Sequence, residues 1–338
     1  MRSKIRWLAG LLAVVVLTFA VTGCNFDAAA KVNGVSIPKS KLEKRLEKQK
    51  KVMEKNGAKF EGESGKKMLD ALRVQILEQL ISEELTLQAA KKEGVMPSNK
   101  EIEERMDQII KSFGSEEEFK KALKEYGYTE DDMREYLKVQ LATNKLFEKV
   151  TRNVSVTDDE VKKYFEENKE NYKIPEGVKV RHILIRFDTQ NERVGRTEEK
   201  AKQEAEEILK KIKAGADFAQ LAKEKSEDPG SKDNGGLLVN QATQDQYFSR
   251  DMLDKAFADA AFALKPGEIT KEVVKSSYGY HIIKLEDKRP EKMPTFEEVR
   301  DKVKEDLLQS KKNEAFKKYL DDFKKKSKIE KFVSSSSK

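Results

Sequence analysis

The spacing of hydrophobic residues changes once along this chain, and that change requires two kinds of architecture in one polypeptide. From residue 35 to residue 171, apolar side chains recur three and four positions apart, as on one face of an α-helix. The longest such run carries Leu72, Ile76 and Leu80 and predicts a helix over about Ser64–Glu93. Two-residue alternation is missing from this region of the sequence, so we predict an all-α domain. Just before it, Val32-Asn33-Gly34-Val35 predicts a small strand or turn.

The start points of several helices are visible in the same region. A hydroxyl residue is followed three positions later by a carboxylate, the spacing of a capping box in which each side chain bonds the other residue's backbone N–H. The pairs are Ser98 with Glu101, Ser115 with Glu118, Thr129 with Asp132 and Thr157 with Glu160. Glycines and Pro97 between these pairs separate one helix from the next.

From Val178 onward the pattern is mixed. Val178–Ile185 is rich in β-branched and apolar residues and predicts a central strand. The following segments predict helices at Thr197–Ala214, Asp217–Lys225 and about Met252–Leu264, and strands at Ile269–Val274 and Tyr280–Leu285. This order of strands and helices indicates an α+β domain with a mainly antiparallel sheet.

A last long helix is predicted to begin at Thr295. It carries Phe296, Val303, Leu307 and Phe316 at roughly helical spacing. A lone helix with so large an apolar face would be a liability in water. We therefore expect it to pack back on the N-terminal helices, which makes the helical domain discontinuous and the α+β domain an insertion in it.

The length and the charge pattern narrow the classes of function. At 338 residues the chain is too long for one ordinary core, and two domains are expected. Its 68 Lys and Arg and 61 Asp and Glu residues give a net charge of +7 but are interleaved nearly everywhere. Because nucleic-acid-binding proteins usually gather basic residues on one face or in one tract, we expect no nucleic acid partner.

The N-terminus predicts export. Arg2, Lys4 and Arg6 precede an apolar run over residues 7–21, which is the layout of a signal peptide and is short for a membrane span of about 20 residues. The run ends in Val21-Thr22-Gly23-Cys24, which resembles the bacterial lipobox.

Cys24 is the only cysteine in the sequence. An exported protein with one cysteine has no internal disulfide, and a free thiol outside the cell is an oxidation liability. A thioether-linked diacylglycerol on Cys24 would explain why the protein has a single cysteine and how it avoids a free thiol. The alternative is a buried structural cysteine. Since two acyl chains suffice for stable attachment, we predict a palmitate-type lipoprotein anchored at Cys24 on the extracytoplasmic face of the cell membrane.

Histidine occurs only twice, as His182 and His281, each in a predicted strand of the α+β domain. Its side chain titrates near neutral pH, which suits acid–base chemistry, metal binding or tuned hydrogen bonding. The pair could instead be core residues satisfied by backbone groups. A metal site is disfavoured, because two ligands without a clustered third make a poor zinc site. A Ser-His-Asp protease is rejected, because no nucleophile-elbow signature is present in the sequence.

Five sequence blocks between Gly177 and Arg289 occur in the order found in parvulin-type peptidyl-prolyl cis-trans isomerases, which this stretch resembles. They are Val180-Arg181-His182-Ile183-Leu184, Phe218-Ala219, Ser226-Glu227-Asp228, Ala260-Ala261-Phe262-Ala263-Leu264-Lys265-Pro266-Gly267-Glu268-Ile269 and Tyr278-Gly279-Tyr280-His281-Ile282-Ile283. With the lipobox-like sequence and the helical flanks, the whole chain is similar to the PrsA foldase lipoproteins of Gram-positive bacteria.

The resemblance implies a domain plan. Residues 1–23 would be the signal peptide, and residues 24–175 a helical chaperone domain. Residues 176–289 would form the parvulin-type domain with a four-stranded, mainly antiparallel sheet. Residues 290–333 would be the returning C-terminal helix, and residues 334–338 a tail.

The resemblance also implies the residues of the site. His182 and His281 would orient each other, and Asp228 would act electrostatically beside the twisting bond. Four residues would form the substrate pocket around the proline ring and its hydrogen-bond network: Leu237, Leu253, Phe257 and Ser276. No cofactor or metal is implied. Arg186, Arg193 and Arg196 are scattered among acidic residues, so we predict no requirement for phosphate.

Two functions remain open at this point. One is a prolyl isomerase that assists the folding of unfolded or partly folded secreted proteins. The other is a non-catalytic holdase chaperone with a parvulin scaffold. The second is motivated by Gly235-Gly236-Leu237-Leu238-Val239, where the family usually has Gly-Gly-Asp-Leu-Gly, and by the large helical fraction of the chain. A groove lined by methionines would suit promiscuous chaperone binding, but we expect most of the five in the helical domain to fill its core: Met53, Met68, Met96, Met106 and Met133. The sequence leaves open whether the chain forms a homodimer.

Overall fold

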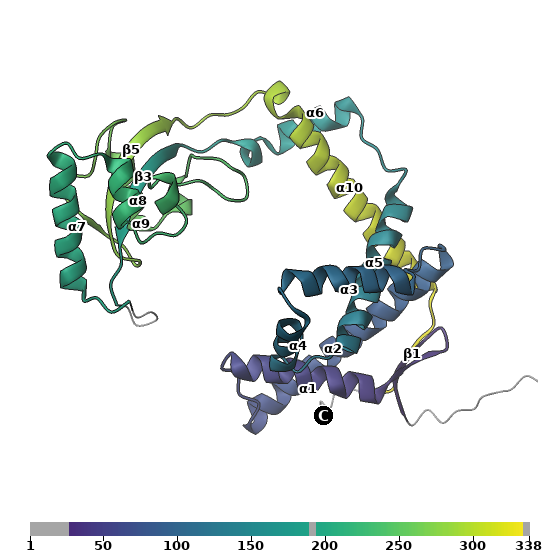
Figure 1. The fold of residues 1–338 in the computed structure, drawn as a ribbon. Helices are drawn as coiled ribbons and strands as arrows, with labels where there is room; N and C mark the ends of the chain where they lie inside the picture. The colour runs from purple at the N-terminus through teal and green to yellow at the C-terminus, as the bar shows by residue number, and fades with distance from the viewer. Residues whose placement is uncertain (1–26, 189–193, 334–338) are drawn as a thin grey trace, which may run out of the picture. The chain divides into compact units, whose positions relative to one another are not determined.

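The computed structural model describes residues 27–188 and 194–333, and the chain divides into two compact units (Figure 1). The helical unit combines Met1–Ser155 with Leu308–Lys338, and the α+β unit spans Val156–Leu307. Among the described residues, no helix is both long and apolar enough to cross a membrane. The predicted signal peptide, Cys24 and the tail lie outside the described residues.

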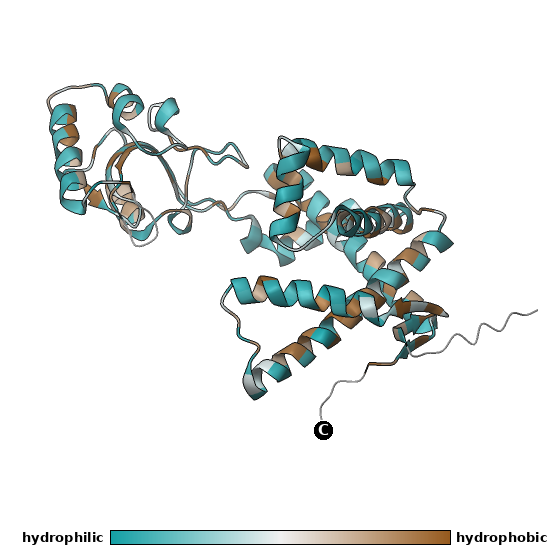
Figure 2. Cartoon of the chain, turned by 60° about the horizontal axis from the view of Figure 1, so that its bottom comes forward, coloured by the Kyte–Doolittle hydropathy of each residue, from teal (hydrophilic) through white to brown (hydrophobic). Residues whose placement is uncertain are grey.

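Amphipathic helices make up most of the helical unit. They are α1 (Lys39–Lys55), α2 (Gly62–Lys92), α3 (Asn99–Ser112), α4 (Glu116–Glu125), α5 (Glu130–Thr151) and the later part of α10 (Phe296–Lys326). Figure 2 shows hydrophobic and hydrophilic stripes alternating around these helices. Ser98 and Thr129 form complete capping boxes with Glu101 and Asp132, while Ser115 only accepts a hydrogen bond from the following turn. These helix starts could be predicted from the sequence because capping is a local interaction.

The helical unit also contains a small sheet, so it is not all-α as predicted, although the strand or turn predicted at Val32-Asn33-Gly34-Val35 is present as the turn between its first two strands. β1 (Ala28–Val32) lies between β2 (Val35–Pro38) and β6 (Ile329–Lys331), antiparallel to both. The β1–β2 turn places Asn33 at φ 50°, and its side chain donates to Ser327 and accepts from the Lys328 N–H. Strands of three to five residues are too short for two-residue alternation to be recognised, and β6 is paired only through tertiary contact.

The helix α10 contributes to both units. Its later part buries Phe316 and Leu320 partly against Ala89 and Leu146 of the helical unit. Its first part packs Val303 and Leu307 against α6 (Asp158–Glu167), which begins with a complete capping box at Thr157. The α+β unit therefore begins at residue 156 and ends at residue 307, beyond the predicted bounds 176–289 on both sides, because this apolar contact joins the flanking helices to it.

The α+β unit is built around one antiparallel sheet. Its remaining elements are η2 (Lys169–Tyr172), β3 (Gly177–Ile185), α7 (Glu198–Lys213), α8 (Phe218–Lys225), η3 (Lys232–Asn234), η4 (Arg250–Met252), α9 (Lys255–Ala263), β4 (Val274–Lys275) and β5 (Tyr280–Arg289). The sheet has three strands in the order β3-β5-β4, where four were predicted.

Irregular segments replace the missing strand. Along the free edge of β3, only isolated bridges form, from Leu237 to Arg181 and from Phe248 to Val178. The predicted strand Ile269–Val274 is reduced to one bridge at Ile269 and the first residue of β4, Val274. Gly235 and Gly236 both adopt left-handed φ angles, which interrupt any regular ladder beside β3.

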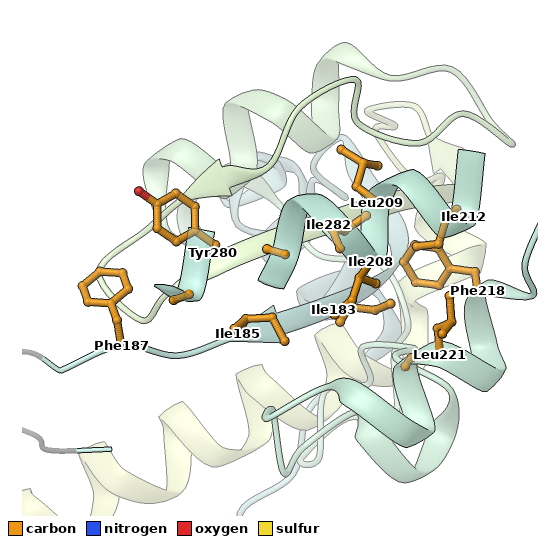
Figure 3. Packing of buried hydrophobic residues seen from close by; sticks show 13 residues of the cluster. Ile183, Ile185, Phe187, Ile208, Leu209, Ile212, Phe218, Leu221, Tyr280 and Ile282 are labelled. Carbon is orange, nitrogen blue, oxygen red and sulfur yellow. The ribbon is translucent and has the colours of Figure 1, made fainter. Parts of the chain in front are cut away.

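One face of the sheet is closed by α7 and α8 (Figure 3). Ile183 and Ile185 of β3 and Ile282 of β5 meet Ile208 of α7 and Leu221 of α8 in this core. The opposite face is covered by α9, which packs on another group of residues: Val178, Val180, Ile283 and Leu285. Successive residues of a strand point to opposite faces, so each strand contributes to both cores.

Candidate active site

The strand register brings the two histidines together on the α9 face. Residues 182 of β3 and 281 of β5 have the same parity as the residues that pack against α9. In the antiparallel pairing His182 lies opposite Ile283, and His281 lies opposite Leu184, so the two histidines are diagonal neighbours. Both side chains are buried, with 4% of each residue exposed.

A chain of hydrogen bonds runs through both imidazoles. The Nδ1 atoms of His182 and His281 lie 3.2 Å apart. The Nε2 atom of His182 is 2.8 Å from Oδ2 of Asp228 and 3.0 Å from Oγ of Ser231, while Nε2 of His281 is 2.7 Å from Oγ of Ser276. All four ring nitrogens therefore have a polar partner.

The chemistry of these partners indicates which ring nitrogens donate a hydrogen bond and which accept one. A carboxylate only accepts, so Nε2 of His182 carries a proton, and in the neutral form of this ring Nδ1 then has a lone pair. His281 then donates its Nδ1–H to His182 and accepts the Ser276 hydroxyl proton at Nε2. The Ser276 oxygen in turn accepts the N–H of Tyr278. This assignment satisfies every donor with both rings neutral.

The electrostatic surroundings keep His281 neutral and Asp228 ionised. Burial and, to a smaller extent, the neighbouring His182 lower the pKa of His281 to about 3, so the His281 ring is neutral at physiological pH. Hydrogen bonding from His182 outweighs desolvation and, with Ser231 and the Gly230 N–H, holds the pKa of Asp228 well below its usual range. Asp228 is thus an ionised carboxylate, with 22% of its side chain exposed.

The loop after α8 positions Asp228 against β3. The backbone N–H of His182 donates to the carbonyl of Gly236, and Glu227 N–H donates to the carbonyl of Leu184. A Cβ atom on Gly236 would lie 2.3 Å from the His182 carbonyl oxygen, so only glycine permits this approach. The turn Asp228–Ser231 is closed by the Gly230 N–H, which donates to Oδ1 of Asp228.

A second ion pair holds the same loop from the other side. Arg196 forms a bidentate contact with Glu227, with both N···O distances 2.8 Å. Burial opposes ionisation of Glu227, but the bonds from Arg196 and the Arg186 N–H lower the pKa of the Glu227 carboxyl. Because the Arg196 guanidinium is engaged by a carboxylate, it is not available to a phosphate group. Arg193 lies outside the described residues.

An aromatic ring closes the apolar side. Phe257 of α9 stands edge-on to both imidazoles, with ring centroids 5.5 Å from His182 and 5.1 Å from His281. Leu253 is partly buried against the Phe257 cluster, whereas its neighbour Met252 is 49% exposed. Leu253 therefore has the better position for an apolar pocket.

The structure brings most of the predicted residues into one network. Asp228, Phe257 and Ser276 contact a histidine directly, while Leu237 is buried beside β3 through its bridge to Arg181. Sequence reasoning missed Ser231, which contacts both His182 and Asp228. No local signal in the sequence marks Ser231, because a serine three residues after Asp228 in a Gly-rich turn has no distinguishing pattern. Among the described residues, no group of three His, Cys, Asp or Glu side chains could hold a metal ion.

This arrangement is better suited to acting on a substrate through the charge of Asp228 than to transferring a proton. Every imidazole nitrogen is occupied by another protein group, so neither ring presents a free base to a substrate. The partly exposed charge of Asp228 and the neighbouring apolar ring of Phe257 remain. An ionised carboxylate held in this way favours one charge distribution of a neighbouring group over another.

Comparisons with known proteins agree with this geometry. A family model described as a PPIC-type PPIase domain matches residues 161–289, and one described as a SurA-like N-terminal domain matches residues 1–147. The foldase protein PrsA of Clostridium botulinum is 34% identical over 338 residues and 94% of each chain is covered. The foldase protein PrsA of Caldanaerobacter subterraneus is 34% identical, with 98% of this chain and 97% of the relative covered.

Among solved structures, a peptidylprolyl isomerase (PrsA) from Bacillus anthracis is 28% identical and covers 74% of this chain and 96% of its own, with a TM-score of 0.29. The sequence relationship extends over nearly the full length of both curated relatives, and it includes both the helical part and the isomerase domain. The chain therefore belongs to the PrsA foldase family, a group of PPIase-type chaperones.

Proposed function

We propose that the chain catalyses cis-trans isomerisation of X-Pro bonds in exported polypeptides. The observation that carries the proposal is the continuous network Asp228–His182–His281–Ser276, which holds one ionised carboxylate beside an aromatic wall. Rotation about the imide bond has a barrier of about 18–20 kcal/mol, because amide resonance is lost in the twisted state. Uncatalysed, it takes tens to hundreds of seconds and limits folding.

The chemistry requires no covalent step. In the planar imide the carbonyl oxygen carries partial negative charge, which decreases as the bond twists. The Asp228 carboxylate, placed near that oxygen, disfavours the planar state more than the twisted one. The pyrrolidine ring would pack against Leu253, which is partly buried in the same cluster as the buried Phe257. The histidines keep Asp228 ionised and fixed, as its hydrogen bond to His182 indicates.

A protease-coupled assay on a proline peptide tests this. We expect the wild-type chain to accelerate isomerisation and Asp228→Ala to lower kcat/KM by about 100-fold, the scale of losing one electrostatic contact to the reacting group. Asp259→Ala is the matched control, because Asp259 pairs only with exposed surface groups of the same unit. Equal inactivity of the wild type and a His182→Ala, Asp228→Ala double variant would refute catalysis.

A holdase function is the second candidate, and a groove in the helical unit favours it. A cavity of about 920 Å³ lies among α1, α2 and α5, with Leu72, Ile76 and Val139 in its wall. Tyr136 lines it while remaining 60% exposed. Of the five methionines in the predicted helical domain, only Met133 lines this groove, whereas Met106 is buried in a core.

Aggregation of an unfolded client at high dilution tests the holdase function. We expect Tyr136→Ser to weaken suppression of aggregation without changing isomerase activity. Tyr126→Ser is the matched control, since Tyr126 is 52% exposed in the same unit but does not line the groove. Equal suppression by both variants and the wild type would exclude a role for the groove.

The site of action is proposed from the sequence. The lipobox-like sequence and the single cysteine support a chain anchored by lipid at Cys24 on the outer face of the membrane. Replacement of Cys24 by Ala should release the protein from isolated membranes into the soluble fraction. Retention of the variant at the wild-type level would contradict lipid attachment.

A further inference from the structure

Ser231 occupies a position that the proposed mechanism leaves without a role. Its hydroxyl donates to Oδ2 of Asp228 and lies 3.0 Å from Nε2 of His182. Only 1% of the residue is exposed, so water does not compete for these contacts. It is thus a buried hydroxyl that touches both members of the charged pair.

We propose that Ser231 is a positioning residue, which holds the Asp228 carboxylate and the Nε2–H form of His182 in one arrangement. The role rests on the proposed isomerase function only in its effect on rate. The effect on the two side chains is a property of the structure itself and is measured separately below.

The backbone around Ser231 makes it a rigid anchor. Its carbonyl oxygen accepts the N–H groups of Asn234 and Gly236, and the Gly236 carbonyl accepts the N–H of His182. The Ser231 side chain is therefore fixed relative to β3 through two successive backbone contacts. A hydroxyl held this way can orient a neighbouring carboxylate without rearranging itself.

Ser231 also completes the set of donors around the carboxylate. Oδ1 of Asp228 accepts from the Gly230 N–H, and Oδ2 accepts from both His182 and Ser231. Without the hydroxyl, Oδ2 retains one donor, and the carboxylate gains freedom to rotate about its last bond. The His182 proton then loses one of its two acceptors at Nε2.

The consequence extends to the second imidazole. If His182 moved its proton to Nδ1, that proton would face the Nδ1–H of His281 across 3.2 Å. His281 would have to move its own proton to Nε2, and Ser276 would have to reverse its hydroxyl. The hydroxyl of Ser231 therefore biases the proton positions on both rings, because each ring can satisfy its partners in only one direction.

Nitrogen-15 NMR of histidine-labelled full-length protein reads this directly. The chain has only two histidines, so four ring-nitrogen signals report both tautomers, and a His281→Gln variant assigns them. In the wild type at pH 7 we expect protons on Nε2 of His182 and Nδ1 of His281. In Ser231→Ala we expect His182 to populate both tautomers, and kcat/KM to fall about tenfold, mostly through kcat.

The control is Ser249→Ala, which removes another buried hydroxyl of the same unit that bonds only Asp251. It should leave both tautomers and kcat unchanged. Should Ser231→Ala not fold, Ser231→Cys decides by the same readouts, because a thiol keeps the volume but is a weak donor.

The outcomes separate this inference from the proposed function. Wild-type tautomers and a kcat/KM within twofold in the Ser231 variant would overturn the positioning role. A wild type without isomerase activity, whose His182 tautomers nevertheless shift in Ser231→Ala, would contradict the proposed function and support the positioning role.

Discussion

The buried neutral imidazole of His281 should make the α+β unit sensitive to mild acid. Burial, followed by the effect of His182, lowers the pKa of His281 from 6.5 to about 3. In the unfolded chain the imidazole returns to about 6.5. Between these values the unfolded state binds a proton that the folded state does not, so stability is full above pH 6.5 and falls as the pH falls toward 3.

The size of the effect follows from the two pKa values. At pH 5 the unfolded imidazole is almost fully protonated and the folded one is not, which corresponds to about 2 kcal/mol. Asp228 does not interfere in this window: its pKa is lowered on folding, so its contribution is lost only as the pH falls below the ordinary aspartate value of 3.8.

Amide hydrogen exchange in β3 and β5 measures how the stability of the α+β unit changes with pH. After correction for the intrinsic rate, the exchange of Ile282 and Ile283 reports the free energy of opening of this sheet. We expect that free energy to fall by about 2 kcal/mol more between pH 7 and pH 5 in the wild type than in His281→Gln.

The same change in both proteins, or titration of His281 near pH 6.5 in the folded chain, would refute the reasoning. The comparison between variants removes the contribution of titrating groups that do not contact His281, because these are common to both proteins.

Three further predictions concern the scaffold. Gly236→Ala should destabilise the α+β unit by more than about 3 kcal/mol, because its Cβ would lie 2.3 Å from a backbone oxygen, while Gly267→Ala, with φ also positive but open space, should cost about 1 kcal/mol; urea unfolding checks both. Asn33→Gly keeps the left-handed turn but removes side-chain bonds to the end of α10, and should lower the unfolding free energy of the helical unit by about 1–2 kcal/mol in the same experiment. Asp254→Ala removes the N-cap of α9 and should cost about 1 kcal/mol and lower kcat by displacing Phe257, whereas Asp254→Asn should restore most of both; unchanged kcat in Asp254→Ala would contradict this link.

The secondary structure of the chain was largely predictable where local interactions decide it. The helix predicted at Ser64–Glu93 is α2, over Gly62–Lys92, since its apolar face and its flanking breaks are encoded within one segment. The first strand was predicted at Val178–Ile185 and is found at Gly177–Ile185. The strand predicted at Ile269–Val274 does not form over its whole length, because most of this segment has no regular partner strand and strand pairing is a tertiary property.

The candidate site likewise contains residues that could be predicted from the sequence and one that could not. Asp228 and His281 were recognisable from motifs, and the sequence alone was sufficient to expect them near His182. Ser231 was not recognisable, because a serine in a Gly-rich turn has no distinguishing local pattern. Its role depends on a fold that seats the turn against β3.

Hydrophobic period, caps and motif order are local properties of the chain, so they were enough to predict most helices, the strands β3 and β5, and that two histidines and one carboxylate belong to one domain. Tertiary structure decided the rest. The antiparallel register of β3 and β5 places the imidazoles 3.2 Å apart at their Nδ1 atoms, and the pairing of β6 with β1 joins the two ends of the chain. These contacts join residues about 100 and 300 positions apart, and only the packing of the folded chain selects among such pairings.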